Sequence, residues 1–135
     1  MKPIFIDTGF LIALLNANDN YHLTATKLSL KYEGISFLTT DAVLLELGNA
    51  LSRSSKQKTS EMIRYFQQSE DASIMHLTPD LFTKGLQLYD KYQDKSWGLV
   101  DCISFVVMQE LELTEVLTFD QHFTQAGFNI LNGPQ

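Results

Sequence analysis

The stretch DKSWGLVDCISFVVMQELELTEVLTFDQHF, residues 94–123, places two acids at positions where α/β proteins often carry functional side chains. Apolar residues recur at helical spacing between 99 and 111, which predicts a mostly buried helix with Asp101 in its first turn. The apolar, β-branched run 115–119 predicts a short strand that ends on Asp120. Each acid alone also has an ordinary structural explanation, because acids stabilise the first turn of a helix and cap the helix that follows a strand.

Strands and helices alternate in the same way through the rest of the chain. Ile4-Phe5-Ile6 is apolar without alternation, as in a strand covered on both faces of a parallel sheet, and it ends on Asp7. This alternation predicts an α/β fold, a three-layer sandwich with a mostly parallel central sheet and helices on both faces, in one domain spanning 1–135. Further strands are expected at 35–38, 72–77 and 127–131, helices at 10–15, 21–32, 41–51, 62–66 and from 78 onward, and a turn at 52–60. Leu81, Phe82, Leu86 and Tyr89 are expected to form the buried side of the helix after Thr78, and the chain is expected to end in a loose Gly133-Pro134 tail.

Composition limits the possible classes of protein. A chain of 135 residues that is 44% hydrophobic can build one real core. Its one cysteine, Cys102, lies in an apolar helix, which excludes a disulfide framework and a cysteine-based zinc site and favours the cytoplasm. The apolar run 10–15 is too short for a signal peptide, and no segment is long enough to cross a membrane. The net charge of −6 argues against a nucleic-acid partner, although two bound divalent cations would reduce it to −2.

Four acids suggest a metal site at one edge of the sheet. Parallel sheets bind ligands outside the carboxyl ends of their strands, where Asp7 and Asp120 are expected to converge if their strands are near neighbours. Glu46 shares a helical face with Asn49. Carboxylates gathered in one pocket raise one another's pKa and favour a bound cation. All-oxygen ligands select Mg²⁺ or Mn²⁺, and a pair of such ions can catalyse phosphodiester hydrolysis.

Four short motifs, in this order and spacing, resemble the PIN-domain nucleases and, among them, the VapC-type toxins of bacterial toxin-antitoxin pairs. They are IDTGFL at 6–11, ELGN at 46–49, WGLVDC at 97–102 and LTFDQHF at 117–123, with a trailing Gly-Phe, so the resemblance covers essentially the whole chain. It implies a PIN-like sandwich and a Mg²⁺-dependent (or Mn²⁺-dependent) ribonuclease that leaves a 5′-phosphate and a 3′-hydroxyl. It also implies that Asp7, Glu46, Asp101 and Asp120 are the acidic quartet, with Thr118 as the hydroxyl near the last acid.

One position departs from the pattern of many relatives, which carry a further aspartate two residues after the last acid. Here that position is His122, so a second metal would be held less tightly. His122 could act as a ligand or phosphate contact, but a surface or capping role is favoured. Asp94 is interpreted as a helix cap in preference to an accessory acid. His22 and His76 are assigned structural roles.

Three alternatives compete with this interpretation. Asp7-Thr8-Gly9 lacks the second aspartate that haloacid-dehalogenase phosphatases need at the position of Gly9. The acid pair and late lysine of a receiver-like signalling domain are missing. The alternative that remains open is a catalytically degenerate PIN domain that binds RNA or protein without cutting.

The resemblance also implies a small antitoxin partner and a homodimer. The helices at 41–51 and 62–66 carry more apolar residues than one sheet face needs, and exposed apolar patches mark interfaces. An antitoxin helix is expected in the groove between them, with an arginine directed at the carboxylates.

Overall fold

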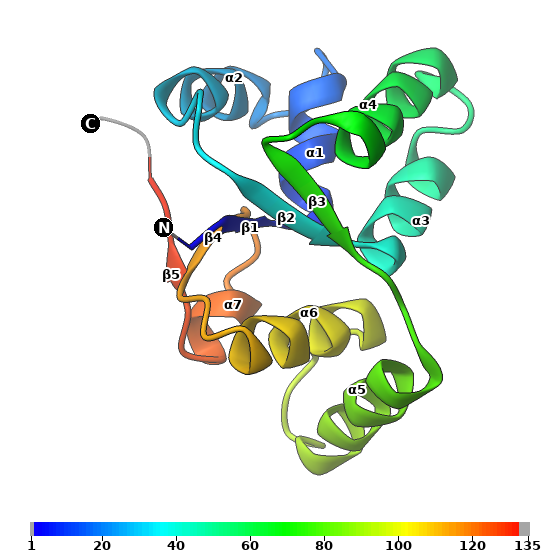
Figure 1. Ribbon diagram of the computed structural model, residues 1–135, viewed down its shortest axis with the longest axis vertical. Coiled ribbons are helices and arrows are strands. Elements are labelled where there is room, and N and C mark those ends of the chain that lie inside the picture. The colour runs from blue at the N-terminus through cyan, green and yellow to red at the C-terminus, as the bar shows by residue number, and fades with distance from the viewer. Residues whose placement is uncertain (1, 133–135) are drawn as a thin grey trace.

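In the computed structural model, which describes residues 2–132, five strands form one parallel sheet in the order β3-β2-β1-β4-β5 (Figure 1). The strands are β1 (Ile4–Ile6), β2 (Phe37–Thr40), β3 (Ala72–Met75), β4 (Glu115–Leu117) and β5 (Asn129–Ile130). The central strands β1 and β4 are neighbours, and Ile6 of β1 lies opposite Leu117 of β4. Their carboxyl ends therefore stop at the same level, which brings Asp7 beside Thr118.

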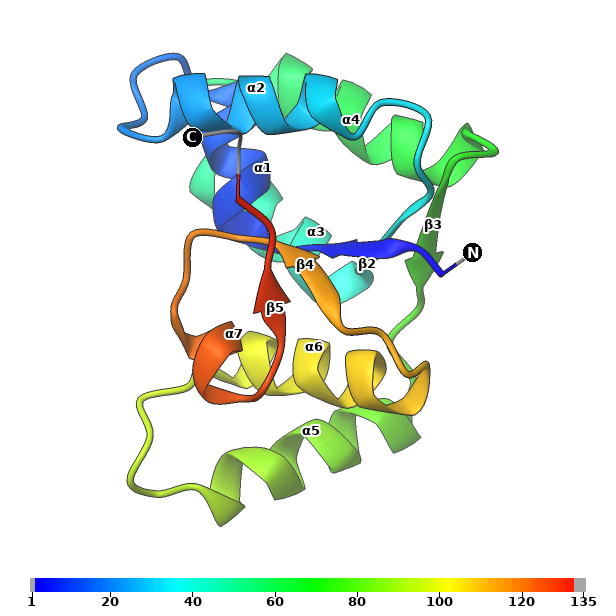
Figure 2. The same ribbon diagram turned by 90° about the vertical axis from the view of Figure 1, so that its left-hand side faces the viewer.

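Helices cover both faces of this sheet, so the predicted α/β sandwich is confirmed (Figures 1 and 2). On one face lie α1 (Thr8–Leu15), α2 (His22–Lys31), α3 (Asp41–Ala50) and α4 (Lys56–Gln68). The other face carries α6 (Leu99–Glu110) and α7 (His122–Gln125), and α5 (Pro79–Lys91) packs outside α6. In the described part of the chain, no helix has both the length and the apolar content needed to cross a membrane.

The core is densest around α6. Seven consecutive residues of this helix, 102–108, are buried, as expected of a helix held between a sheet and another helix. Phe105 packs edge-on against Trp97 and against Phe123, with ring centroids 5.0 and 4.9 Å apart. Trp97 precedes α6 and Phe123 lies in α7, so these aromatic contacts hold the segments that flank Asp101 and Asp120 against α6.

Several sequence-based expectations are wrong. The expected turn at 52–60 is replaced from Lys56 onward by α4, whose first turns are mostly polar and exposed. Strand β2 lies two residues later than expected. In α5, Leu81 is buried, but Phe82, Leu86 and Tyr89 are 42, 41 and 45% exposed. The helix instead turns Gly85 toward α6, where a small residue permits close approach. The expected Gly-Pro tail lies outside the described residues.

Candidate metal centre

Asp7 is the most buried acid of the site. It follows β1 as the N-cap residue of α1, and only 4% of its surface is exposed. Its backbone N–H donates to the carbonyl of Leu117 at 3.1 Å, which continues the pairing of β1 with β4. Its carboxylate Oδ2 accepts a 2.8 Å hydrogen bond from the Thr118 hydroxyl. The sheet thus sets the position of this carboxylate from both strands.

Thr118 connects Asp7 to the next acid. The same hydroxyl oxygen accepts a 3.0 Å hydrogen bond from the backbone N–H of Asp120. Asp120 Oδ1 in turn accepts from the backbone N–H of His122 at 2.9 Å, in a tight turn that begins α7. Asp120 is therefore held between a strand end and a helix start, and it both caps that turn and faces the pocket.

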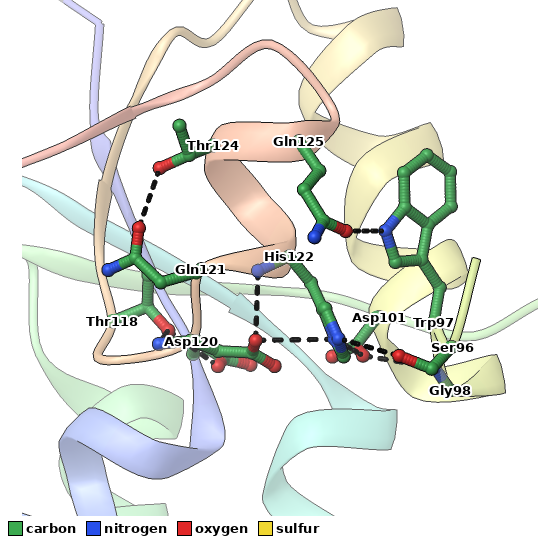
Figure 3. Close-up of polar contacts among 11 residues, drawn as sticks. Ser96, Trp97, Gly98, Asp101, Thr118, Asp120, Gln121, His122, Thr124 and Gln125 are labelled. Carbon is green, nitrogen blue, oxygen red and sulfur yellow. Dashed lines mark hydrogen bonds and ion pairs between the residues drawn. The ribbon is translucent and has the colours of Figure 1, made fainter.

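Asp101 comes from a separate segment and lies in the first turn of α6. Its Oδ2 accepts from the backbone N–H of Gly98 at 3.0 Å, so it stabilises the start of the helix. Figure 3 shows the His122 ring next to both Asp101 and Asp120. His122 Nδ1 lies 3.4 Å from Asp101 Oδ2 and 3.2 Å from Asp120 Oδ1, while Nε2 lies 3.2 Å from the Ser96 hydroxyl. The ring of His122 therefore links Asp101 to Asp120, and its role as a ligand, a surface residue or a cap stays a prediction.

The acids open onto a cavity of about 580 Å³. All members of the predicted quartet line it, with Glu46 reaching it from the exposed side of α3. None of the four predicted accessory residues is part of the lining. Thr118 and His122 contact the acids that line it, whereas Asn49 is exposed and Asp94 is exposed beside Lys95. The N-cap of α6 is Gly98, so the predicted capping role of Asp94 is wrong. The full lining is Asp7, Thr8, Gly9, Ile12, Asp19, Tyr21, Glu46, Asp101, Phe119, Asp120 and Gln121.

The electrostatics of the pocket favour a bound cation. Burial raises the pKa of Asp7 to about 7, and the charges of Asp101 and Asp120 add to this rise while the Thr118 hydrogen bond opposes it. The pKa of Asp101 is also raised, mainly by burial, against the opposing hydrogen bond from Gly98. Without a bound metal, Asp7 and Asp101 therefore keep their protons to a higher pH than ordinary carboxyl groups do.

The donor atoms fit a divalent metal ion. One carboxylate oxygen each from Asp101 and Asp120 and a ring nitrogen of His122 lie within 4.8 Å of one another. The hydroxyl of Thr8, buried in the same lining, has no hydrogen-bond partner among the described residues. A metal-bound water is the kind of group that could satisfy it. An oxygen-rich set of this kind suits Mg²⁺ or Mn²⁺.

Two contacts of the site were not expected from the sequence. Tyr21, 52% exposed at the rim of the cavity, stacks on Phe119 with ring centroids 4.4 Å apart and ring planes at 9°. Ser96 contacts His122. Both pairs join residues far apart in the chain, so no local pattern indicates them. The only local signal for either contact was the presence of His122 two residues after Asp120.

Comparison with known proteins agrees with this architecture. The PIN domain family profile matches residues 4–129. The chain is 30% identical over 125 residues to the 23S rRNA-specific endonuclease VapC20 of Mycobacterium tuberculosis, covering 93% of this chain and 95% of that protein. The crystal structure of VapC20, described as a sarcin-ricin loop cleaving toxin, superposes with a TM-score of 0.85 at 27% identity, covering 96% of this chain and 98% of that one.

More distant structures share the fold alone. VapBC2 from Rickettsia felis, bound to a DNA fragment from its promoter, gives a TM-score of 0.62 at 13% identity and covers 98% of this chain and 100% of that one. FitAcB from Neisseria gonorrhoeae gives 0.59 at 15% identity, with 96% of each chain covered. On its sequence profile and its architecture, the chain belongs to the PIN domain family.

Proposed function

We propose that this chain is a divalent-metal-dependent endoribonuclease of the VapC toxin type. The observation that carries the proposal is the convergence of Asp7, Asp101 and Asp120 on one cavity, each held by a hydrogen bond to a strand end or helix start. Similarity to VapC20 over nearly the whole of both chains supports the same activity. Mg²⁺ or Mn²⁺ is the proposed ion.

Each residue has a separate task in this proposal. Asp7 and Asp101 would hold the metal directly, and Asp120 and Glu46 would hold it directly or through water. When bound, the ion supplies stabilisation of the phosphate charge and a water of lowered pKa. Thr118 orients Asp7 and favours its charged form, since the hydroxyl donates to the carboxylate. Hydrolysis joins a water oxygen to phosphorus and breaks the bond to the 3′ oxygen, which takes up a proton and leaves as a hydroxyl.

RNA needs a contact surface besides the acids, because the chain carries a net charge of −6. Tyr21 supplies one at the rim of the cavity: one ring face rests on Phe119, and half of the residue is exposed. Aromatic rings bind bases of any sequence by stacking. Tyr21 therefore places a base next to the acids.

The first substrate to test is structured ribosomal RNA, because VapC20 is named for cleaving 23S rRNA. Purified protein is incubated with total ribosomal RNA and with a synthetic sarcin-ricin stem-loop, with Mg²⁺ or Mn²⁺ and with EDTA. Cleavage with 5′-phosphate ends is expected only with metal. It should be lost in Asp101→Asn and kept in Asp94→Asn, an exposed acid outside the cavity.

Cleavage that survives both EDTA and Asp101→Asn would overturn the metal mechanism. Tight RNA binding without cleavage under any metal would favour the second candidate, a degenerate PIN domain that binds RNA without cutting. The observation that favours this candidate is His122, which stands where many relatives carry an acid.

An antitoxin partner is part of the same proposal. An apolar cavity of about 400 Å³ lies between α1, α2 and α4, not between α3 and α4 as the sequence suggested. The reason is that α3 turns most of its apolar residues into the core, whereas Met62 and Tyr65 of α4 face the cavity. An amphipathic helix of a small protein would fill it.

A cytoplasmic location follows from the ribosomal RNA substrate. A homodimer is also proposed, built on the exposed apolar stripe of α5 formed by Phe82, Leu86 and Tyr89.

A further inference from the structure

Building on the proposed metal-dependent activity, we propose that His122 binds the metal through Nδ1 and shifts the preference of the site from Mg²⁺ toward Mn²⁺ and Co²⁺. A nitrogen donor in place of a carboxylate changes which ions the position selects, because imidazole suits transition metals and Mg²⁺ prefers oxygen. His122 is thus a metal-selectivity residue of this chain.

The distances around Nδ1 match those between neighbouring ligands of one ion. Two ligands at right angles, each about 2.1 Å from an octahedral metal, lie about 3.0 Å apart. Nδ1 lies 3.2 Å from Asp120 Oδ1 and 3.4 Å from Asp101 Oδ2. All three donor atoms lie within 4.8 Å of one another, so modest side-chain shifts would bring them onto one ion.

The other ring nitrogen has the partner that a ligating histidine needs. Nε2 lies 3.2 Å from the Ser96 hydroxyl, at the outer side of the ring (Figure 3). When Nε2–H donates to Ser96, the Nδ1 lone pair points at the acids, and this is how supporting contacts orient metal-bound histidines. The backbone N–H of His122 also donates to Asp120 Oδ1, so ring and carboxylate are placed by the same turn.

A protonated His122 is the competing explanation of the same contacts. In that form the ring would donate to both acids and act as a fixed cation in the place of a metal. The two explanations predict opposite effects of removing the ring: loss of a ligand weakens metal binding, whereas loss of a positive charge strengthens it.

The test uses the full chain without RNA and three probes, Mg²⁺, Mn²⁺ and Co²⁺, whose dissociation constants are measured by calorimetry. Pulsed electron paramagnetic resonance of the Mn²⁺-loaded protein then reports whether a ¹⁴N nucleus is bound directly. The variants are His122→Asp, which restores an all-oxygen site, and His122→Ala. His76→Ala is the matched control, since His76 contacts a carboxylate, Asp41, at 3.1 Å outside the cavity.

Wild type and His76→Ala should show the ¹⁴N coupling, and both His122 variants should lose it. The preference for Co²⁺ over Mg²⁺ should fall roughly tenfold in His122→Asp, the scale of change when a metal site loses a supporting group. Absence of the coupling in wild type, or tighter metal binding in His122→Ala, would overturn the inference. If Mn²⁺ binds and cleavage depends on Asp101 but no nitrogen is detected, only this inference fails. If no divalent ion binds, the proposed function fails with it.

Discussion

Asp7 makes the folded state of the metal-free protein depend on pH. In the unfolded chain its carboxyl loses its proton near the ordinary value of 3.8, but in the folded protein burial and the neighbouring acids raise the pKa to about 7. The folded state therefore binds more protons than the unfolded state between these values. The free energy of unfolding accordingly falls as pH rises from about 4 to 7, by on the order of a few kcal/mol.

Asp7→Asn should remove this loss of stability at high pH, since the amide is uncharged and its oxygen can still accept the hydrogen bond from the Thr118 hydroxyl. The melting temperature in EDTA should rise by several degrees at pH 8 and should not rise at pH 4. Differential scanning calorimetry checks this, with Asp94→Asn as an exposed control. Equal melting temperatures of the wild type and Asp7→Asn at pH 8 would show that the charge of Asp7 does not lower the stability of the folded protein.

Tyr21 should contribute to RNA affinity through its ring and not its hydroxyl. Tyr21→Ala should weaken binding by about 1–3 kcal/mol, the usual worth of one stacked base, while Tyr21→Phe should bind as wild type. Fluorescence anisotropy on an Asp101→Asn background measures binding without cleavage. Tyr65→Ala, a tyrosine of similar exposure on α4, is the control, and an equal loss there would argue against a specific base contact.

At the scale of elements, the contact between α5 and α6 depends on a glycine. A Cβ on Gly85 would lie 2.6 Å from Ile103 Cγ1 and 3.4 Å from Ile103 Cα, so the helices would have to separate. Gly85→Ala should therefore destabilise the protein by about 1–3 kcal/mol, as overpacking does. Gly48→Ala in α3, where nothing lies within 4 Å, should instead stabilise it by about 0.5–1 kcal/mol. Chemical denaturation of both variants tests the contrast, and destabilisation by both would contradict it.

The same elements show what a sequence can and cannot reveal. The strands before Asp7 and Asp120 were predictable because runs of buried residues mark them, and parallel topology then places their ends together. The second strand is shorter than predicted, however: β4 ends at Leu117, and Thr118 and Phe119 lie between it and Asp120. Glu46 was placed only on a helical face with Asn49, and nothing in the sequence showed that this face is turned toward the other acids. The α5 face was predicted wrongly because Phe82 and Leu86 outweigh Gly85 in any hydrophobic pattern, although the glycine allows the closest packing. The Ser96–His122 and Tyr21–Phe119 contacts depend on how distant loops meet, which no local pattern records.

At the scale of the whole molecule, the stripe of Phe82, Leu86 and Tyr89 lies on the outermost helix (Figure 2). Such a continuous exposed apolar face is expected to pair with a second copy of the chain. Light scattering after size exclusion should give twice the chain mass, and Leu86→Lys should give a monomer. Leu23→Lys, at a residue of α2 that is 73% exposed, should remain a dimer; a monomeric wild type would refute the pairing.

The apolar cavity and the acid pocket lie on either side of α1. Leu11, Leu14 and Leu15 line the cavity, whereas Thr8 and Ile12 line the pocket. An antitoxin helix seated in the cavity therefore has to extend past only one helix for an arginine to reach the carboxylates, where a charge-assisted pair would exclude the metal.

Growth measurements test this arrangement. Expression of the chain alone should arrest growth. If the neighbouring gene encodes a small protein, its co-expression should restore growth. Met62→Lys, which places a charge in the cavity, should keep the arrest but escape the partner, whereas Leu30→Lys, at an exposed position outside the cavity, should behave as wild type. Asp7→Ala should abolish the arrest, since Asp7 is one of the proposed metal ligands. Rescue of Met62→Lys as complete as that of wild type would mean that the partner binds elsewhere, because a lysine at position 62 would place a charge in a mostly apolar groove that a bound helix removes from water.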